Sequence, residues 1–284
     1  MCCFSREVKE VKNTRIFGRV GAQGNQVLIY QMALTADEEV AMVLPIPVKA
    51  GQGEKAVTFH DLQGYPALFD DLHKGFPVPA STYGDTFGVA SAPGRGKLEV
   101  ISVGAFDASY VPGIADFTRL DERFRLPADV WPRLPGYREF GFAVFKLKPG
   151  HSKIQPMAFT FPTAKPEEIF FPTLHIHDGK IHEKERFDHT LYCQSTRHDL
   201  SKWEESPKLA VSFAKCGLTH GMLRPEQHVY RRTVQGMLVN GEGSLSFGRM
   251  YSSVSESHAP VTSRDTMARH KNRQREREDH SKSQ

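Results

Sequence analysis

Residues 15–48 carry the pattern that decides the fold class, RIFGRVGAQGNQVLIYQMALTADEEVAMVLPIPV. Residues 15–20 show a two-residue alternation of side chains, and a longer apolar run covers residues 26–34. The residues between them, Gly-Ala-Gln-Gly-Asn at 21–25, are of the types that form turns. Two such runs around a glycine-containing turn predict a β-hairpin.

A third apolar run, Val40–Val48, follows directly. Its Pro45 and Pro47 have no backbone N–H to donate to a neighbouring strand, and proline is normally confined to the edges of sheets. We therefore expect an edge strand here, or a strand that leaves the sheet at Leu44.

Apolar residues at helical spacing predict one short helix from Tyr65 to Leu72, with a glycine at Gly75 to end it. Its Asp70 and Asp71 are expected on the solvent face. Further short helical segments are expected at 114–124, 128–134 and 206–217, and further strands at 98–106, 140–147, 157–161, 170–177, 180–183, 187–194, 229–239 and 244–250. Strands that follow one another with few helices between them favour an α+β fold, mainly of antiparallel or mixed β-sheet with a few short helices.

The chain has 284 residues, and its content of apolar and charged side chains differs between two parts. We expect a single β-rich globular domain over residues 1–255 and a disordered charged tail over residues 256–284, because the tail contains few large apolar side chains. The formal net charge is +4, and +3 of it lies in residues 262–284. The nearly neutral body argues against a nucleic-acid-binding groove, so that only weak contact through the basic tail is expected.

Two features of the sequence predict a cytoplasmic protein with no membrane partner. No apolar run reaches the roughly 20 residues that a membrane helix needs. The first residues, MCCFSRE, lack the apolar segment of a secretory signal. In that compartment the four cysteines, Cys2, Cys3, Cys193 and Cys216, are expected as free thiols.

The stretch LHIHDGKIH, residues 174–182, is the most informative for function. Asp-Gly between two alternating runs is a strong signal for a tight hairpin. In that hairpin His175 lies opposite His182, and His177 joins them on one face because side chains alternate along a strand. Three neutral imidazoles on one face form a candidate site for zinc or another divalent transition metal.

Two further candidate ligands, His189 and Cys193, share one face of the following run. A metal held by these residues would activate a bound water molecule if the protein is an enzyme. The alternative is a non-enzymatic interaction domain in which the histidine face meets solvent and the histidines are incidental. Lys180 on the same face favours that alternative, because its charge opposes a cation.

Cys2 supports a different hypothesis. Removal of Met1 would place a thiol beside a free α-amino group, so that one residue supplies both nucleophile and base. The start Met1-Cys2 resembles that of N-terminal nucleophile hydrolases, which act on amide bonds. In those enzymes the cysteine opens a strand within two packed sheets, whereas here the polar residues 7–12 precede the first strand that the pattern predicts.

Common catalytic motifs are missing from the sequence. There is no G-x-S-x-G elbow, no phosphate-binding G-x-x-x-x-G-K-[ST] loop and no dinucleotide fingerprint, and His182-Glu183 is not followed by the second histidine of H-E-x-x-H. The sequence is therefore compatible with both an enzyme and a non-enzymatic protein, and it identifies no substrate or partner.

Overall fold

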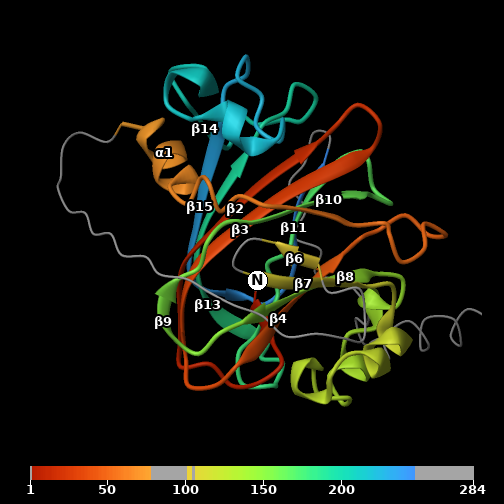
Figure 1. The fold of residues 1–284 in the computed structure, drawn as a ribbon. Helices are drawn as coiled ribbons and strands as arrows, with labels where there is room; N and C mark the ends of the chain where they lie inside the picture. Colours follow the sequence, from red (N-terminus) through yellow and green to blue (C-terminus); the bar gives the residue numbers. More distant parts are fainter. Residues whose placement is uncertain (1, 78–100, 104–105, 247–284) are drawn as a thin grey trace, which may run out of the picture. The chain divides into compact units, whose positions relative to one another are not determined.

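The computed structural model describes residues 2–77, 101–103 and 106–246, and this part of the chain is mostly β-sheet (Figure 1). The strands are β1 Cys2–Phe4, β2 Glu10–Val20, β3 Asn25–Ala36, β4 Val40–Ile46, β5 Thr58–His60, β6 Ile101–Val103, β7 Phe106–Val111, β8 Gly141–Leu147, β9 Gly150–Lys153, β10 Met157–Pro162, β11 Glu168–Phe171, β12 His175–Ile176, β13 Lys184–Cys193, β14 Glu204–Glu205, β15 Tyr230–Val239 and β16 Gly243–Ser246. The helical elements are α1 Leu68–Lys74 and the 3-10 turns η1 Ile114–Arg119, η2 Glu122–Phe124, η3 Trp131–Arg133, η4 Pro135–Tyr137, η5 Ala210–Ser212 and η6 Cys216–Thr219. None of the helices in these residues is long and apolar enough to span a bilayer.

Two mixed sheets contain most of the strands. An eight-stranded sheet has the order β14-β15-β13-β2-β3-β10-β5, with β9 paired to β3. A six-stranded sheet has the order β12-β1-β4-β8-β7-β6. Each sheet includes one parallel pair, β13 with β2 and β12 with β1, and the remaining pairs are antiparallel. The predicted hairpin of residues 15–34 is confirmed as β2 and β3.

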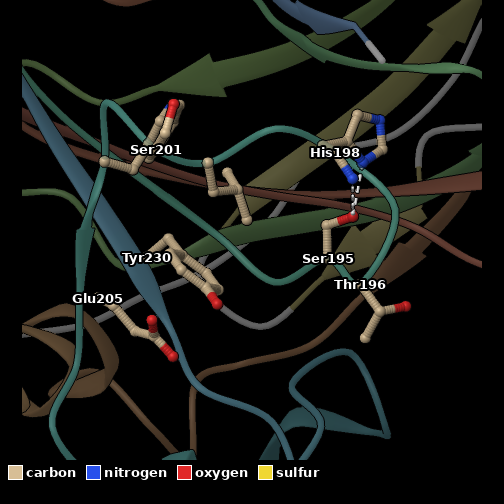
Figure 2. Close-up of a pocket in the computed structure, with 8 residues that line it drawn as sticks. Ser195, Thr196, His198, Ser201, Glu205 and Tyr230 are labelled. Carbon is tan, nitrogen blue, oxygen red and sulfur yellow. Dashed lines mark hydrogen bonds between the residues drawn. The ribbon is translucent and has the colours of Figure 1, made fainter. Parts of the chain in front are cut away.

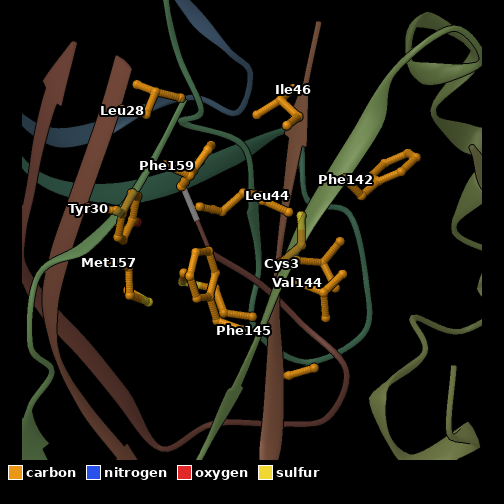
Figure 3. Close-up of a cluster of buried hydrophobic side chains, with 14 of the residues drawn as sticks. Cys3, Leu28, Tyr30, Leu44, Ile46, Phe142, Val144, Phe145, Met157 and Phe159 are labelled. Carbon is orange, nitrogen blue, oxygen red and sulfur yellow. The ribbon is translucent and has the colours of Figure 1, made fainter. Parts of the chain in front are cut away.

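Buried side chains from both sheets meet in one core. Figure 3 shows Leu28 and Tyr30 of β3 in the same cluster as Leu44 of β4 and Phe145 of β8. Edge-on ring contacts continue through this core, as between Phe59 and Phe145, whose centroids lie 5.5 Å apart. Burial of this many aromatic and aliphatic side chains is the main stabilising contribution to the fold.

The other face of the eight-stranded sheet is also covered. Alternate residues of β3, Val27 and Ile29, belong to a second core with Leu68 and Phe69 of α1. The ring of Phe69 lies 5.8 Å from that of Tyr192 on β13. Because both faces of β3 are buried, its sequence is an almost continuous apolar run and not an alternating one.

The prediction that residues 40–48 form an edge strand or leave the sheet at Leu44 is wrong, because β4 lies between β1 and β8 and its pairing with β8 continues to Ile46. Ala41 exchanges hydrogen bonds with Ser5 on the β1 side, so the backbone groups of Pro45, four residues later, face that side too. The register with β1 extends only to Val43. Pro45 therefore lies beyond the last residue of β4 that pairs with β1, and its lack of an N–H costs no hydrogen bond between these two strands.

Other differences concern short elements. Residues 206–217 form 3-10 turns in place of the predicted helix. β16, the strand that follows β15 in the chain, pairs with β11. The predicted strand 98–106 is described only as β6 and the start of β7. Residues 247–284, which include the predicted tail 256–284, lie outside the described residues, so the division into a domain and a tail stays a prediction.

Candidate functional site

Three buried or partly buried histidines lie together, one from each sheet and one from the segment that follows β12. His175 lies in β12 of the six-stranded sheet, His177 follows two residues later, and His189 lies in β13 of the eight-stranded sheet. The alternation of β13 places Glu185, Phe187 and His189 on one face. β12 is held by its pairing with β1, and the side chain of His175 contacts that of His189 on β13.

The imidazole rings are in direct contact. His175 stacks on His177 with ring centroids 4.9 Å apart, and on Phe187 from the other side at 4.5 Å. His189 meets His175 edge-on, and their Nε2 atoms are 3.2 Å apart. Since each neutral ring has one N–H and one acceptor nitrogen, one Nε2–H donates to the other Nε2 in this pair.

A possible ligand set is present in this cluster. One ligand atom each from His175, His177 and Glu185 lies within 4.8 Å of the other two. Nδ1 of His175, Nε2 of His177 and Nδ1 of His189 are buried and have no hydrogen-bond partner among the described residues. Buried polar atoms are normally paired, so three unpartnered ring nitrogens in one place call for a ligand or for a functional explanation.

Burial keeps these rings neutral. It lowers the pKa of His175 to about 2 and that of His177 to about 4. It also lowers the pKa of His189 well below its ordinary value. A neutral imidazole keeps a lone pair, which is the form that binds a metal ion. The cluster is therefore ready for coordination throughout the physiological pH range.

The backbone of His175 is held by residues of the segment that follows β15. Asn240 accepts from the backbone N–H of His175 at 2.7 Å and donates to its carbonyl at 2.8 Å. Glu242 accepts from the N–H groups of Thr173 and Leu174 and from the hydroxyl of Tyr137. These contacts clamp the segment that leads into β12.

Burial raises the pKa of Glu242 to about 7. Asn240 and Glu242 are two residues apart, in a segment rich in glycine that separates β15 from β16. Local pattern could not identify them as supporting residues, because their partners lie more than 60 residues earlier in the chain.

The predicted Asp-Gly hairpin of residues 174–182 is wrong. β12 pairs with β1 and not with residues 180–183, which form no strand. The side chain of Asp178 accepts from the N–H of Lys180, so the aspartate forms a local turn of its own. The carboxamide of Asn240 bridges the carbonyls of His175 and His182, which a hairpin would have paired directly.

The structure brings together some of the predicted ligands and separates others. His175, His177 and His189 form the cluster, whereas His182 is exposed and its Nε2 lies 3.1 Å from Asp178. Cys193 shares a strand face with His189 but is four residues along it, about 13 Å at the usual rise per residue. It is fully buried in the core, and burial raises its thiol pKa well above the ordinary value. Glu185 was not predicted, although its position in the same alternating run is the signal that could have found it.

A separate open pocket of about 470 Å³ lies beside β15, between the pair Ser195–His198 and Tyr230 (Figure 2). The Ser195 hydroxyl oxygen is 2.5 Å from Nδ1 of His198. The same oxygen accepts from the backbone N–H groups of Arg197 and His198. Nε2 of His198 lies 3.1 Å from the carbonyl oxygen of Glu167. This arrangement is a serine turn that is stabilised at both ends, and we assign the pair to loop structure.

Comparison with known proteins finds distant structural likeness only. No protein-family model matches the chain. No curated protein matches it either. The fold is similar to the crystal structure of baculovirus P35, at 13% sequence identity and a TM-score of 0.46, over 84% of this chain and 97% of that chain. A mutated baculovirus P35 after caspase cleavage matches at 12% identity and a TM-score of 0.45, over 82% and 99% of the two chains. P35 in its complex with caspase-8 matches at 12% and 0.41, over 84% and 97%. No function is assigned to this chain from likeness at this level.

Proposed function

We propose that this protein binds one divalent transition metal ion, with zinc as the first candidate, through His175, His177 and Glu185. The observation that carries the proposal is the convergence of their ligand atoms within 4.8 Å, together with buried ring nitrogens that have no partner among the described residues. Two imidazoles and one carboxylate are a ligand set that zinc uses, and they also suit iron or manganese. His189 contacts His175 and acts as a positioning residue for its ring.

Such an ion would connect the two sheets. His175 belongs to the six-stranded sheet and Glu185 to the eight-stranded sheet, so coordination would add a link between sheets that packing and the His175–His189 hydrogen bond already join. Binding to the folded state alone stabilises a protein in proportion to the logarithm of ligand concentration over Kd. We therefore propose a structural contribution first. Activation of a water molecule at the fourth position of a three-ligand site stays a prediction from the sequence.

The test is zinc binding by the full-length protein after treatment with a chelator and desalting. We expect about one zinc per chain by elemental analysis and a raised unfolding temperature, with stabilisation of about 2.7 kcal/mol at a free zinc concentration of 100 Kd. His175→Ala and Glu185→Gln should both lose the zinc and the stabilisation. His182→Ala is the matched control, because His182 is exposed and lies outside the cluster.

Circular dichroism of each variant separates loss of a ligand from loss of the fold. Glu185→Gln is the more informative substitution, since Glu185 is only partly buried and its replacement keeps the size of the side chain. Uptake of much less than one equivalent by the wild type, or equal uptake by Glu185→Gln and the wild type, would contradict the proposal.

A second candidate function concerns Cys2, because β1 begins at this residue and its backbone pairs with that of His175. This is the position in a sheet that an N-terminal cysteine nucleophile acting on amide bonds requires. The candidate depends on removal of Met1, which the intact mass of the purified protein measures. A retained Met1, or amide hydrolysis that is unchanged in Cys2→Ala, would eliminate it.

A further inference from the structure

The outer edge of the eight-stranded sheet is unpaired over most of β15. On one side β15 pairs with β13 along its whole length, from Tyr230 to Val239. On the other side the two residues of β14 pair only with Tyr230 and Arg231. Among the residues that the structure describes, no strand pairs with the edge from Arg232 to Val239.

This edge lacks the features that normally protect an exposed strand. Natural edge strands carry charged residues, prolines or a covering loop that block pairing with another chain. Residues 233–239, TVQGMLV, contain no charged residue and no proline. Met237, Leu238 and Val239 are exposed by 64%, 39% and 52%, and they are among the few large apolar side chains that face solvent in the described part of the chain.

We propose that this edge pairs antiparallel with the same edge of a second copy of the chain, with a two-fold axis at Gly236. In that register Gln235 lies opposite Met237, Val234 opposite Leu238 and Thr233 opposite Val239. Each pair combines side chains on the same face of the joined sheet, and no two like charges are opposed. Arg232, the nearest charged residue, lies opposite the neutral Asn240.

The edge of β15 matches itself when it is turned about Gly236, and this favours a second copy of the chain over an unrelated peptide as its partner. A two-fold interface uses the same patch twice, so a sequence that matches itself about its own centre satisfies the requirement without any further partner. Gly236 at the centre has no side chain, and its φ of +106° is a conformation that other residues rarely adopt. The two backbones therefore meet at the axis without a side chain between them. The proposal is independent of metal binding.

The test is the oligomeric state of the full-length protein by sedimentation velocity over a range of concentrations. We expect a dimer in the wild type, and a dissociation constant about tenfold higher or more in Met237→Glu and in Gln235→Lys. In each variant the new charge, which has Arg186 or Asp188 beside it on β13 of its own chain, lies opposite a neutral side chain of the second copy. The double variant should recover dimerisation, because the two new charges face each other across the axis. Val211→Lys, an exposed apolar position outside β15, is the matched control and should leave the dimer unchanged.

These substitutions are at exposed positions, so the variants should fold as the wild type does. A wild-type monomer at all concentrations would overturn the proposal, even if the edge then bound an added peptide. A dimer that is insensitive to Met237→Glu, or that is weakened further in the double variant, would overturn it as well.

Discussion

At Asp71, a carboxylate that helical periodicity places on the solvent face is buried. Its oxygens accept from the hydroxyl of Tyr65 and from the ammonium of Lys74, both at 2.8 Å. The Tyr65 hydroxyl in turn accepts from the backbone N–H of Lys215 at 2.9 Å, and burial raises the pKa of this tyrosine. One hydroxyl therefore connects α1 to the segment that covers it, 150 residues away in the chain.

We expect Tyr65→Phe to lower the free energy of unfolding by about 1–3 kcal/mol, because a buried oxygen of Asp71 and the partly buried N–H of Lys215 lose their partner. Urea denaturation measures this change. Thr118→Val removes an exposed side-chain hydrogen bond to Ala115 and serves as the control, with an expected change within about 0.5 kcal/mol. Equal effects of the two substitutions would show that the buried hydroxyl has no special role.

Glycines at two positions give a second prediction at the residue scale. A Cβ at Gly18 of β2 would lie 2.7 Å from Cγ2 of Ile169 and 3.0 Å from Cε1 of Phe171, both on β11. Gly18→Ala should therefore destabilise the protein by about 1–3 kcal/mol through overpacking. At Gly136 a Cβ would meet no atom within 4 Å, and Gly136→Ala should be tolerated. Thermal unfolding of both variants measures the difference between them. Equal stability of Gly18→Ala and Gly136→Ala would show that β11 moves away from β2 without cost.

At the scale of elements, strand identity and strand partners were not equally predictable. The strands β8, β10, β13 and β15 lie where apolar pattern predicts them. Their partners include pairs that no local pattern indicates, such as β1 with β12 and β11 with β16. β1 itself was missed, because three residues at the start of a chain give too short a run for periodicity to be recognised.

The clamp on β12 gives a prediction at this scale. Glu242→Ala leaves the N–H groups of Thr173 and Leu174 and the Tyr137 hydroxyl without their acceptor, and each buried group costs about 1–3 kcal/mol. We expect Glu242→Ala to be strongly destabilised and Glu242→Gln to be affected less, since the amide oxygen still accepts. Hydrogen exchange at residues 173–176 measures the loosening. Protection that is unchanged in Glu242→Ala would contradict the role of this side chain.

At the scale of the whole molecule, the buried histidines make stability depend on pH. The pKa values of His175 and His177 are lowered to about 2 and about 4, and that of His189 is lowered as well. Below about pH 6.5 the unfolded chain binds protons at these histidines that the folded chain does not, so stability falls as the pH falls. Glu242, with a pKa raised to about 7, acts in the opposite direction between about pH 4.5 and 7, because the folded state holds the proton there.

The three histidines contribute more than the one carboxyl, with a net difference of nearly two bound protons, so we expect the free energy of unfolding to decrease by about 2–3 kcal/mol per pH unit between pH 6 and 5. Urea denaturation with a chelator present at each pH measures this slope. Glu242→Gln should make the slope steeper, since it removes the opposing contribution. Stability that is constant or rises over this interval would contradict the assignment of neutral, buried rings.

The sequence by itself determined that this chain forms a mostly β fold and where most strands lie, and it predicted a set of candidate ligands, His175, His177, His182, His189 and Cys193, of which the structure brings three histidines together. These features depend on the alternation of side chains along a strand, which is a local property of the backbone. Only the tertiary structure decided that β12 pairs with β1, that Glu185 joins the histidines while His182 and Cys193 do not, and that Asn240 and Glu242 hold the site. Strand pairing and side-chain convergence depend on contacts between residues that are distant in the chain, and their free energy is set by packing in the assembled core and not by any local pattern.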